Sequence, residues 1–266
     1  MRVTALYRYP VKSLGGELLT SARPAERGLE DDRRWMLIDA DGTFVSQRTH
    51  PHLARFRAAT YGTHGLRIFR VADGELLVDL PDARPPADST SRVTVWDDTF
   101  RAPTIRSRQL ETALSLPGVR LAYMHEDVDR PVDPRYARNA ERVSFADGYP
   151  YLITTTASLQ DLSRHYGESL DPRRFRPNII VETTEPYTED HWSVIEVGNH
   201  AFYLPKPCAR CVMITNDPDN GQRDPAVMRQ LAAHRKVGNK VLFGMNAIWK
   251  GGAGDLRVGD MVTAIT

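Results

Sequence analysis

Cys208 and Cys211 are the only cysteines in the chain of 266 residues, and just two residues separate them. A pair at this spacing is typical of metal ligands or of a redox dithiol. Structural zinc needs about four ligands, but the chain has no second cysteine pair and its eight histidines are scattered. A thioredoxin-type dithiol stands at the start of a helix, whereas residues 212–215 are largely β-branched and predict a strand. Zinc and dithiol sites are therefore both disfavoured.

Two interpretations of the pair stay open. One thiolate can be the single protein ligand of a metal whose other ligands come from a cofactor, and Arg210 between the cysteines favours a deprotonated thiol. Alternatively, both cysteines are buried structural residues without a chemical role. The cysteine spacing alone does not decide between these two interpretations.

A second set of residues has the chemistry of an anion site. Lys12 and Ser13 follow the first predicted strand, and an ammonium and a hydroxyl in a strand-end loop suit a phosphate. Arg33 adds a guanidinium in the same half of the chain. Arg176 and Asn178 are two residues apart, so in an extended strand their side chains point to one side and can grip one ligand. Each arginine alone is equally consistent with a surface ion pair.

Composition limits the class of partner. The chain has 35 Lys and Arg against 34 Asp and Glu, a formal charge of +1, which argues against nucleic acid or an anionic membrane as partner. Hydrophobic residues make up 41% and charged residues 26%, as in globular proteins. No apolar run approaches the roughly 18–20 residues of a membrane span, and residues 1–20 lack the apolar core of a secretion signal. We expect a soluble cytoplasmic protein.

Most of the elements that position these residues are predicted strands. Short strand-like runs joined by Asp-Gly loops predict hairpins over 35–46 and 66–78. The polar segment 126–144 lacks either periodicity and predicts a long loop, either a solvated connector or a lid over a site. Further strands are predicted over residues 3–9, 92–96, 178–181, 193–197, 201–204, 212–215 and 256–265.

Three helices have clear end signals. Ser107 can cap the first, the second begins near Thr156 and ends at Gly167, and Asp224 followed by Pro225 starts the third. A boundary near residue 120, after the first helix, divides the chain into domains 1–120 and 121–266.

Several segments together resemble the MOSC family, named for molybdenum cofactor sulfurase C-terminal domains. The resemblance covers nearly the whole chain and extends to amidoxime-reducing members and to bacterial members that detoxify N-hydroxylated bases. It implies a β-rich α+β fold with a few peripheral helices, in which an N-terminal β-barrel-like domain precedes the MOSC β-barrel. The matching segments are Tyr9–Ser13, Gly28–Leu29, Asp32–Trp35, Arg48–Pro51, Tyr149–Pro150, Ala157–Leu159, Phe175–Asn178, Cys208–Cys211, Asn216–Gly221 and Phe243–Asn246.

The resemblance also implies roles for individual residues. Cys211 is the family's molybdenum ligand, and Asp147 occupies the position of an acidic residue close to the metal, where it is the candidate proton carrier. Ala209 stands where the reductases often have serine, which removes one hydroxyl near the cofactor. The residues that would hold the pterin and its phosphate are Lys12, Ser13, Arg33, Arg176, Asn178, Ala209 and Arg210.

The function implied is a molybdenum-cofactor-dependent oxidoreductase, an enzyme that reduces small N-hydroxylated compounds by oxygen-atom transfer to molybdenum. The chain has no cysteines left for the iron–sulfur domain of some bacterial members. We therefore expect a separate electron donor of the ferredoxin or flavin reductase type, and no nucleic acid or membrane partner. The alternative is a carrier of molybdenum cofactor or sulfur without catalytic turnover.

Overall fold

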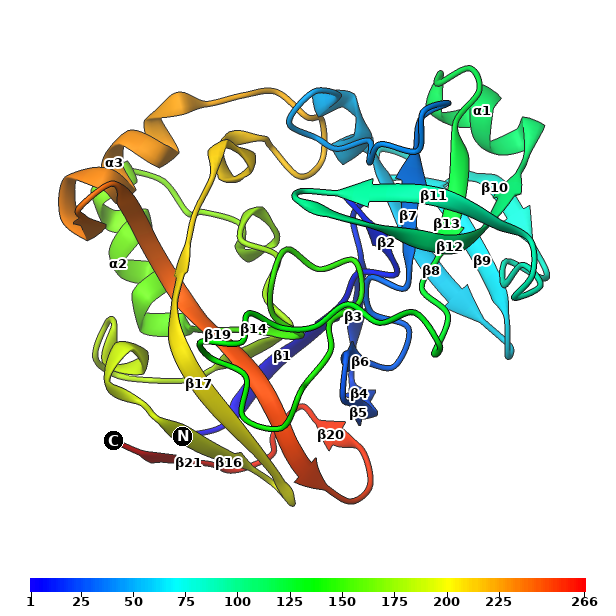
Figure 1. Cartoon of the computed structure of the whole chain (residues 1–266). Coiled ribbons are helices and arrows are strands. Elements are labelled where there is room, and N and C mark those ends of the chain that lie inside the picture. Colours follow the sequence, from blue (N-terminus) through cyan, green and yellow to red (C-terminus); the bar gives the residue numbers. More distant parts are fainter.

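The computed structural model describes all 266 residues, as 21 strands, three α-helices and four 3-10 helices. The predicted β-rich α+β class is therefore confirmed. Figure 1 shows two bodies side by side, one built around the long strands β17 and β19 with α2 and α3, the other containing β7 to β13 and α1.

The first body is a nine-stranded sheet whose interior holds a cluster of 16 buried residues. The first strand of the chain, β1, lies inside this sheet between β15 and β3, so both ends of the sequence contribute to it. The predicted boundary near residue 120 stays a prediction. In sheet order the strands are β21 (Val262–Ile265), β16 (Val194–Val197), β17 (His200–Ala209), β19 (Lys240–Gly252), β14 (Tyr151–Thr155), β15 (Ile179–Val181), β1 (Val3–Arg8) and β3 (Glu17–Leu19), with β18 (Lys236–Val237) paired to β19.

The second body packs a five-stranded and a three-stranded sheet around 17 buried residues, among them Trp35 and Leu110. The five-stranded order is β11 (Thr90–Val95), β12 (Asp98–Arg106), β13 (Arg120–Tyr123), β7 (Trp35–Ile38) and β2 (Val11–Lys12), and the three-stranded order is β10 (Leu76–Leu80), β9 (Gly65–Arg70) and β8 (Phe56–Tyr61). Two short pairs complete the strands: β4 (Ser21–Ala22) with β20 (Leu256–Arg257), and β5 (Pro24–Ala25) with β6 (Gly28–Leu29).

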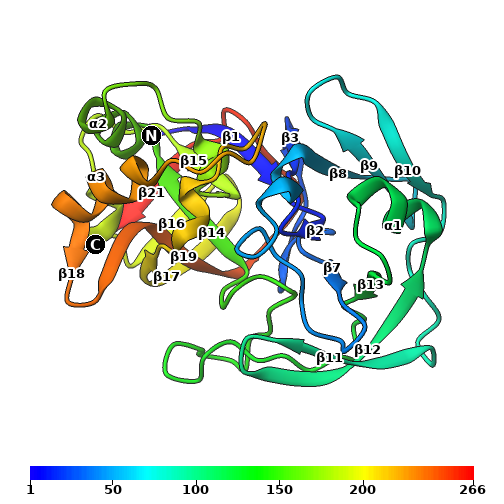
Figure 2. The same ribbon diagram turned by 90° about the horizontal axis from the view of Figure 1, so that it is seen from above.

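All three predicted helices are confirmed. Ser107 caps α1 (Arg108–Leu114), and Asp224 caps α3 (Pro225–Arg235) by accepting from the amide of Ala226. Helix α2 (Thr156–Tyr166) ends at Gly167, whose φ of 98° suits glycine. Helices α2 and α3 pack together at one end of the first body, α2 against β14 and α3 against β19 (Figure 2). The 3-10 helices are η1 (Pro51–Arg55), η2 (Pro172–Arg174), η3 (Thr188–His191) and η4 (Val212–Thr215).

Three strand predictions were wrong. Residues 212–215 form the single turn η4, because the Thr215 hydroxyl donates to the Val212 carbonyl (2.7 Å) and Ile214 is buried beside the helices. Residues 43–46 make only isolated bridges, at Thr43 and Phe44, so the first predicted hairpin lacks its second strand. A turn divides residues 256–265 into β20 and β21.

The long loop between β13 and β14 is confirmed, because no helix or strand lies between Tyr123 and Tyr151. The loop is nevertheless not a plain solvated connector. Val132 and Val143 are buried with Ile248 of β19, and Val128 packs into the core of the second body. This loop therefore packs against both bodies and joins them.

Candidate active site

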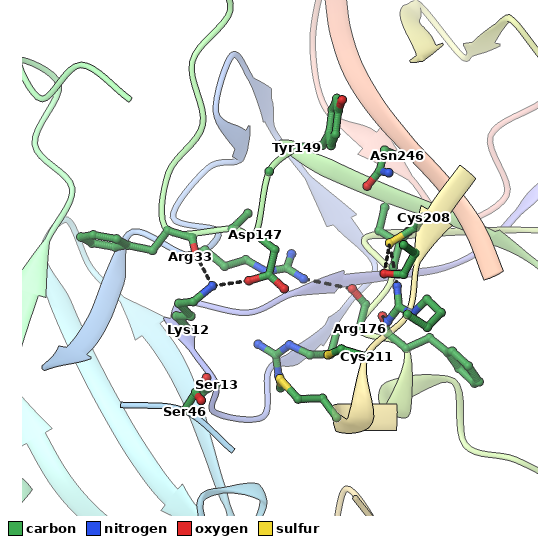
Figure 3. A pocket seen from close by; sticks show the side chains of 18 of the residues that line it. Lys12, Ser13, Arg33, Ser46, Asp147, Tyr149, Arg176, Cys208, Cys211 and Asn246 are labelled. Carbon is green, nitrogen blue, oxygen red and sulfur yellow. Dashed lines mark hydrogen bonds and ion pairs between the residues drawn. The ribbon is translucent and has the colours of Figure 1, made fainter. Parts of the chain in front are cut away.

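An open cavity with about 880 Å³ of empty space, its mouth included, lies where the two bodies meet. The cysteine segment enters it from one side and the residues of the second body from the other (Figure 3). The structure brings all the predicted site residues together here: the cavity is lined by Lys12, Ser13, Arg33, Asp147, Arg176, Asn178, Cys208, Ala209, Arg210 and Cys211. Their roles stay predictions.

The two cysteines occupy different local structures. Cys208 lies in β17, and Cys211 stands directly before the turn η4. The arginine between them holds the segment in place, because Arg210 donates from Nη1 to Cys208 Sγ (3.0 Å) and from Nη2 to the carbonyl of Phe175 (2.7 Å). The pair therefore does not open an α-helix as a thioredoxin-type dithiol does. Both thiols are free and partly exposed.

The protein alone does not complete a metal site at Cys211. No group of three or more His, Cys, Asp or Glu side chains is placed to hold a metal ion anywhere in the chain. A metal bound at Cys211 would therefore take its other ligands from a cofactor or from solvent.

The cavity is strongly cationic. Its lining holds six cationic side chains and one carboxylate, that of Asp147. Arg33 and Arg174 have carboxylate partners elsewhere in the protein, Asp32 and Asp217. The other three arginines, Arg48, Arg176 and Arg210, form no ion pair, and the Nε atoms of Arg48 and Arg210 are buried without a hydrogen-bond partner.

Two of the guanidinium groups share one aromatic ring. Arg33 and Arg176 lie 4.5 and 4.2 Å from the ring centroid of Tyr9. Burial, together with the neighbouring charge of Arg33, lowers the pKa of Arg176 to about 10. Asp32 balances only one of these two neighbouring charges, and the second is electrostatically costly unless a ligand supplies another anion. Together with the orphaned Nε atoms, this arrangement fits a phosphate-bearing cofactor.

Asn178 and Arg176 do not act as the sequence pattern predicts. Arg176 has a φ of 57°, in the left-handed region, and lies outside β15, so the alternation of an extended strand does not apply. The Asn178 Oδ1 atom accepts from Arg33 Nη1 (3.0 Å) and from the amide of Leu152 (3.1 Å), and its Nδ2 donates to the carbonyl of Tyr7 (3.1 Å). Asn178 therefore orients Arg33, and its polar atoms are bonded to the protein.

Opposite the cysteines, Lys12 and Asp147 form an ion pair (Figure 3). The Lys12 ammonium is buried and also donates to the carbonyl of Phe145 (2.8 Å), while Trp96 Nε1 donates to the Asp147 carboxylate (3.2 Å). Desolvation raises the pKa of Asp147, but the Lys12 charge outweighs it and holds the pKa well below the usual range. Burial lowers the pKa of Lys12 despite its partner. The proton of the pair therefore sits on Lys12.

Comparison with known proteins agrees with this geometry. Residues 1–108 match the MOSC N-terminal beta barrel domain and residues 140–263 match the MOSC domain. Over 243 residues, 84% of this chain and 68% of the relative, the sequence is 30% identical to mitochondrial amidoxime reducing component 2 of Macaca fascicularis. The chain belongs to the MOSC family.

Other relatives differ in how much of them the MOSC chain covers. Human mitochondrial amidoxime-reducing component 1 is 26% identical, over 98% of this chain and 82% of its own length. The molybdenum cofactor sulfurase of Caenorhabditis briggsae is 27% identical over 91% of this chain but only 33% of its own length. No helix of the chain is both long and apolar enough to span a bilayer.

Both matched regions of the MOSC chain build the cavity. Lys12, Arg33 and Trp96 come from the N-terminal region, and Asp147 and Cys211 from the MOSC domain. The second body is therefore part of the site itself.

Sequence reasoning missed several lining residues as members of the site. Trp96 was predicted as the end of a strand, and nothing in its local pattern reveals that a hairpin carries it into the cavity. Asn246 lies within one of the matching family segments and was assigned no role, although it donates from β19 to the carbonyl of Pro207 (3.3 Å) beside the cysteine pair. Phe44, Ser46, Arg174 and Met213 are among the other lining residues that were missed.

Proposed function

We propose that the protein is a molybdenum-cofactor-dependent reductase of small N-hydroxylated compounds such as amidoximes, hydroxylamines and N-hydroxylated bases. The observation that carries the proposal is a single cavity in which Cys211 faces unpaired arginines and an ammonium–carboxylate pair. The similarity to the amidoxime reducing components supports the choice of substrate.

In this proposal the thiolate and the arginines of the cavity have separate roles in binding the cofactor. Cys211 supplies the thiolate, a soft ligand suited to molybdenum. Arg176 and Arg210, which have no carboxylate partner, bind the phosphate of the pterin, and Arg33 is oriented toward the same place by Asn178. When bound, the molybdenum cofactor supplies a metal that accepts the oxygen atom of the N–O bond and returns two electrons to the substrate.

The protein must also manage protons, because oxygen that is removed from the substrate leaves as water. Asp147 is ionised at neutral pH, since its pKa is lowered by Lys12, so it cannot itself be the acid. The acid of the pair is the Lys12 ammonium, and Asp147 is the group through which the proton passes toward the cavity. Asp147 thus keeps the role of proton carrier that the resemblance implies, with Lys12 as the source of the proton.

The chain offers no redox centre of its own besides the two thiols. We propose that electrons come from a separate protein of the ferredoxin or flavin reductase type. We place its transient contact at the open mouth of the cavity.

Metal analysis tests the proposal. Purified protein is expected to hold about one molybdenum and one pterin per chain, and Cys211→Ala should lose the molybdenum because its only protein ligand is gone. Cys208→Ala is the matched control, since it removes a thiol three residues away that is not the expected ligand, and it should keep the metal. Molybdenum retained in Cys211→Ala contradicts the ligand assignment.

The carrier alternative has one supporting observation, the match to molybdenum cofactor sulfurase. A carrier of sulfur should hold a persulfide on Cys211 without molybdenum. Sulfane sulfur in place of metal, or failure of molybdenum-loaded protein to reduce a benzamidoxime under an artificial reductant, favours the carrier.

A further inference from the structure

A buried arginine of the long loop, Arg130, joins that loop to the hairpin β11–β12. Its side chain is 3% exposed, and its Nε donates to the carboxylate of Asp98, the first residue of β12 (2.8 Å). Its Nη1 donates to the carbonyls of Ser144 and Ala146 (both 2.6 Å). A guanidinium presents these donors in a fixed fork, so the position of the three acceptors relative to one another is set by one rigid group.

A second buried cation bonds the same segment. The Lys12 ammonium donates to the carbonyl of Phe145, which lies between the two carbonyls that Arg130 holds (2.8 Å). The Phe145 ring is buried in the core of the second body, and the Phe145 amide donates to the carbonyl of Arg33 (3.0 Å). Three successive carbonyls directly before Asp147 are therefore bonded to a guanidinium or an ammonium, which leaves this backbone little freedom.

The side chain of Asp147, in contrast, is open to the cavity. It is 62% exposed, whereas the Lys12 side chain with which it pairs is 7% exposed. Ion pairs with an exposed member are weak, because the exposed side chain loses rotamer freedom when it is held in one place. Packing does not hold the Asp147 carboxylate, so its contact with Lys12 depends on where the backbone of residue 147 is placed.

We propose that Arg130 is a positioning residue for the proton-carrying pair of the cavity: its forked hydrogen bonds fix the backbone before Asp147 and so keep the carboxylate on the Lys12 ammonium. The proposal rests on the proposed function for the use that is made of the proton. A lysine at position 130 would carry the same charge without the fork, so charge and position can be separated by experiment.

The titration of Asp147 in the full cofactor-free chain tests the position without turnover. Although desolvation raises the pKa of Asp147, the Lys12 charge holds it well below the ordinary value of 3.8, so the carbon-13 signal of the carboxyl should stay constant down to about pH 3. In Arg130→Lys the pKa should rise by about one unit or more, because the carboxylate moves away from Lys12. Arg48 and Arg176, the other cations that act on Asp147, are unchanged in this variant.

Asp98→Ala loosens the same fork from the hairpin side. The Asp98 side chain is 50% exposed, so this variant should fold even where a change at the buried Arg130 impairs folding. Loss of a negative charge alone would lower the pKa of Asp147, whereas loss of position should raise it. The direction of the shift therefore separates the two effects, and we expect a rise.

Arg142 provides the matched control in the same loop. It donates to the Glu26 carboxylate and to the carbonyl of Glu126, and none of its hydrogen bonds reaches the segment that carries Asp147. Arg142→Lys should lose a comparable fork and some stability in urea, yet keep the wild-type titration of Asp147. An unchanged titration in Arg130→Lys or Asp98→Ala, or an equal shift in Arg142→Lys, overturns the proposal.

Turnover of benzamidoxime by loaded protein separates this proposal from the proposed function. Arg130→Lys should lower kcat about 10–100-fold with KM nearly unchanged, because a displaced proton carrier slows the reaction and leaves substrate binding intact. The acidic limb of the pH dependence of kcat should move to higher pH with the pKa of Asp147. Wild-type kcat in an active Arg130→Lys variant rejects the positioning role and leaves the reductase. The expected titrations in loaded protein that reduces no N-hydroxylated compound reject the reductase and leave the positioning of the pair by Arg130.

Discussion

The arginines of the cavity fall into two groups, those that pair with a carboxylate of the protein and those that do not. Arg174 and Arg33 are held by carboxylates within the protein, whereas Arg176 is not, and its pKa is lowered to about 10 by burial and by Arg33. A charged side chain that destabilises the folded protein without a ligand, and that binds the ligand when it is present, is typical of a binding site.

Arg176→Met should therefore act differently on two measurements. In cofactor-free protein it should change the free energy of unfolding in urea little, because loss of the hydrogen bond from Arg176 to the Leu14 carbonyl offsets removal of a charge without a carboxylate partner. In loaded protein it should weaken retention of the pterin about 10–100-fold, the value of one or two charge-assisted hydrogen bonds. Arg174→Met is the matched control and should lower stability in both states, because it leaves Asp217 without its partner. Equal destabilisation by the two variants in cofactor-free protein contradicts the argument.

Glu189 is a buried carboxyl group, and the neighbouring charge that acts on it is the like charge of Asp190. Its Oε2 accepts from the hydroxyls of Thr155 and Ser158 (both 2.9 Å), and its Oε1 has no partner. Burial raises the pKa of Glu189 above its ordinary value of 4.5. Folding therefore favours the protonated form, so the contribution of this group to stability is present below about pH 4.5 and is lost as the pH rises through the raised pKa.

Glu189→Gln cannot ionise and should escape this loss. The difference in free energy of unfolding between the variant and wild type should shift in favour of the variant between pH 5 and pH 8, measured by urea denaturation. The exposed Glu185→Gln serves as control and should show no such shift. A pH-independent difference for Glu189→Gln means that the carboxyl is ionised throughout.

Among the elements, β19 approaches the neighbouring strand β14 so closely that one of its positions requires glycine. Gly244 has a φ of 72°, and a Cβ atom there would lie 2.7 Å from Thr154 Cγ2 and 2.8 Å from the carbonyl oxygen of Ile153 in β14. Only glycine combines this backbone angle with this approach. The same strand carries Asn246 past the cysteine segment of β17.

Gly244→Ala should lower the free energy of unfolding by about 2–4 kcal/mol, the sum of a left-handed alanine and an overpacked contact. Gly118→Ala offers a matched control, because its φ is 75° and nothing lies within 4 Å of the added Cβ. Gly118→Ala should lower the free energy of unfolding only by the contribution of the left-handed backbone conformation, about 1–2 kcal/mol. Urea denaturation of both variants gives the difference; similar losses would assign the whole effect to the backbone angle.

The sequence predicted an element correctly where the interactions that define its ends lie within the element itself. The caps Ser107 and Asp224 and the stop at Gly167 located the helices, since a capping side chain acts within one turn. The strand prediction for residues 212–215 was wrong because burial of Ile214 against the helices overrides the β-propensity of the segment. The predicted site residues all line one cavity, but the position of Trp96 depends on a contact between Arg130 and a distant hairpin, and this contact has no local pattern.

At the scale of the whole molecule, the two ends of the sequence build one sheet. Strand β1 lies between β15 and β3, and its residues Val3 and Leu6 are buried in the sheet's core. The MOSC-domain half therefore lacks an internal strand when it is separated from the start of the chain.

A fragment of residues 121–266 should consequently fail to fold cooperatively. Circular dichroism melting of the fragment should show a broad transition and its amide spectrum little dispersion, whereas the full chain should melt sharply. A fragment that melts sharply with a dispersed spectrum shows that β1 is dispensable and that the two halves are separable domains.

The tip of the hairpin β11–β12 has a consequence for how the cavity can diverge within the family. Asp97 is exposed at the hairpin tip, whereas Trp96 beside it belongs to the cavity lining. The Trp96 ring lies against Lys12 and Arg48, and its Nε1 donates to the Asp147 carboxylate. Exchanges at Trp96 therefore alter the cavity wall and the ion pair of Lys12 with Asp147 together, whereas exchanges at Asp97 leave both in place.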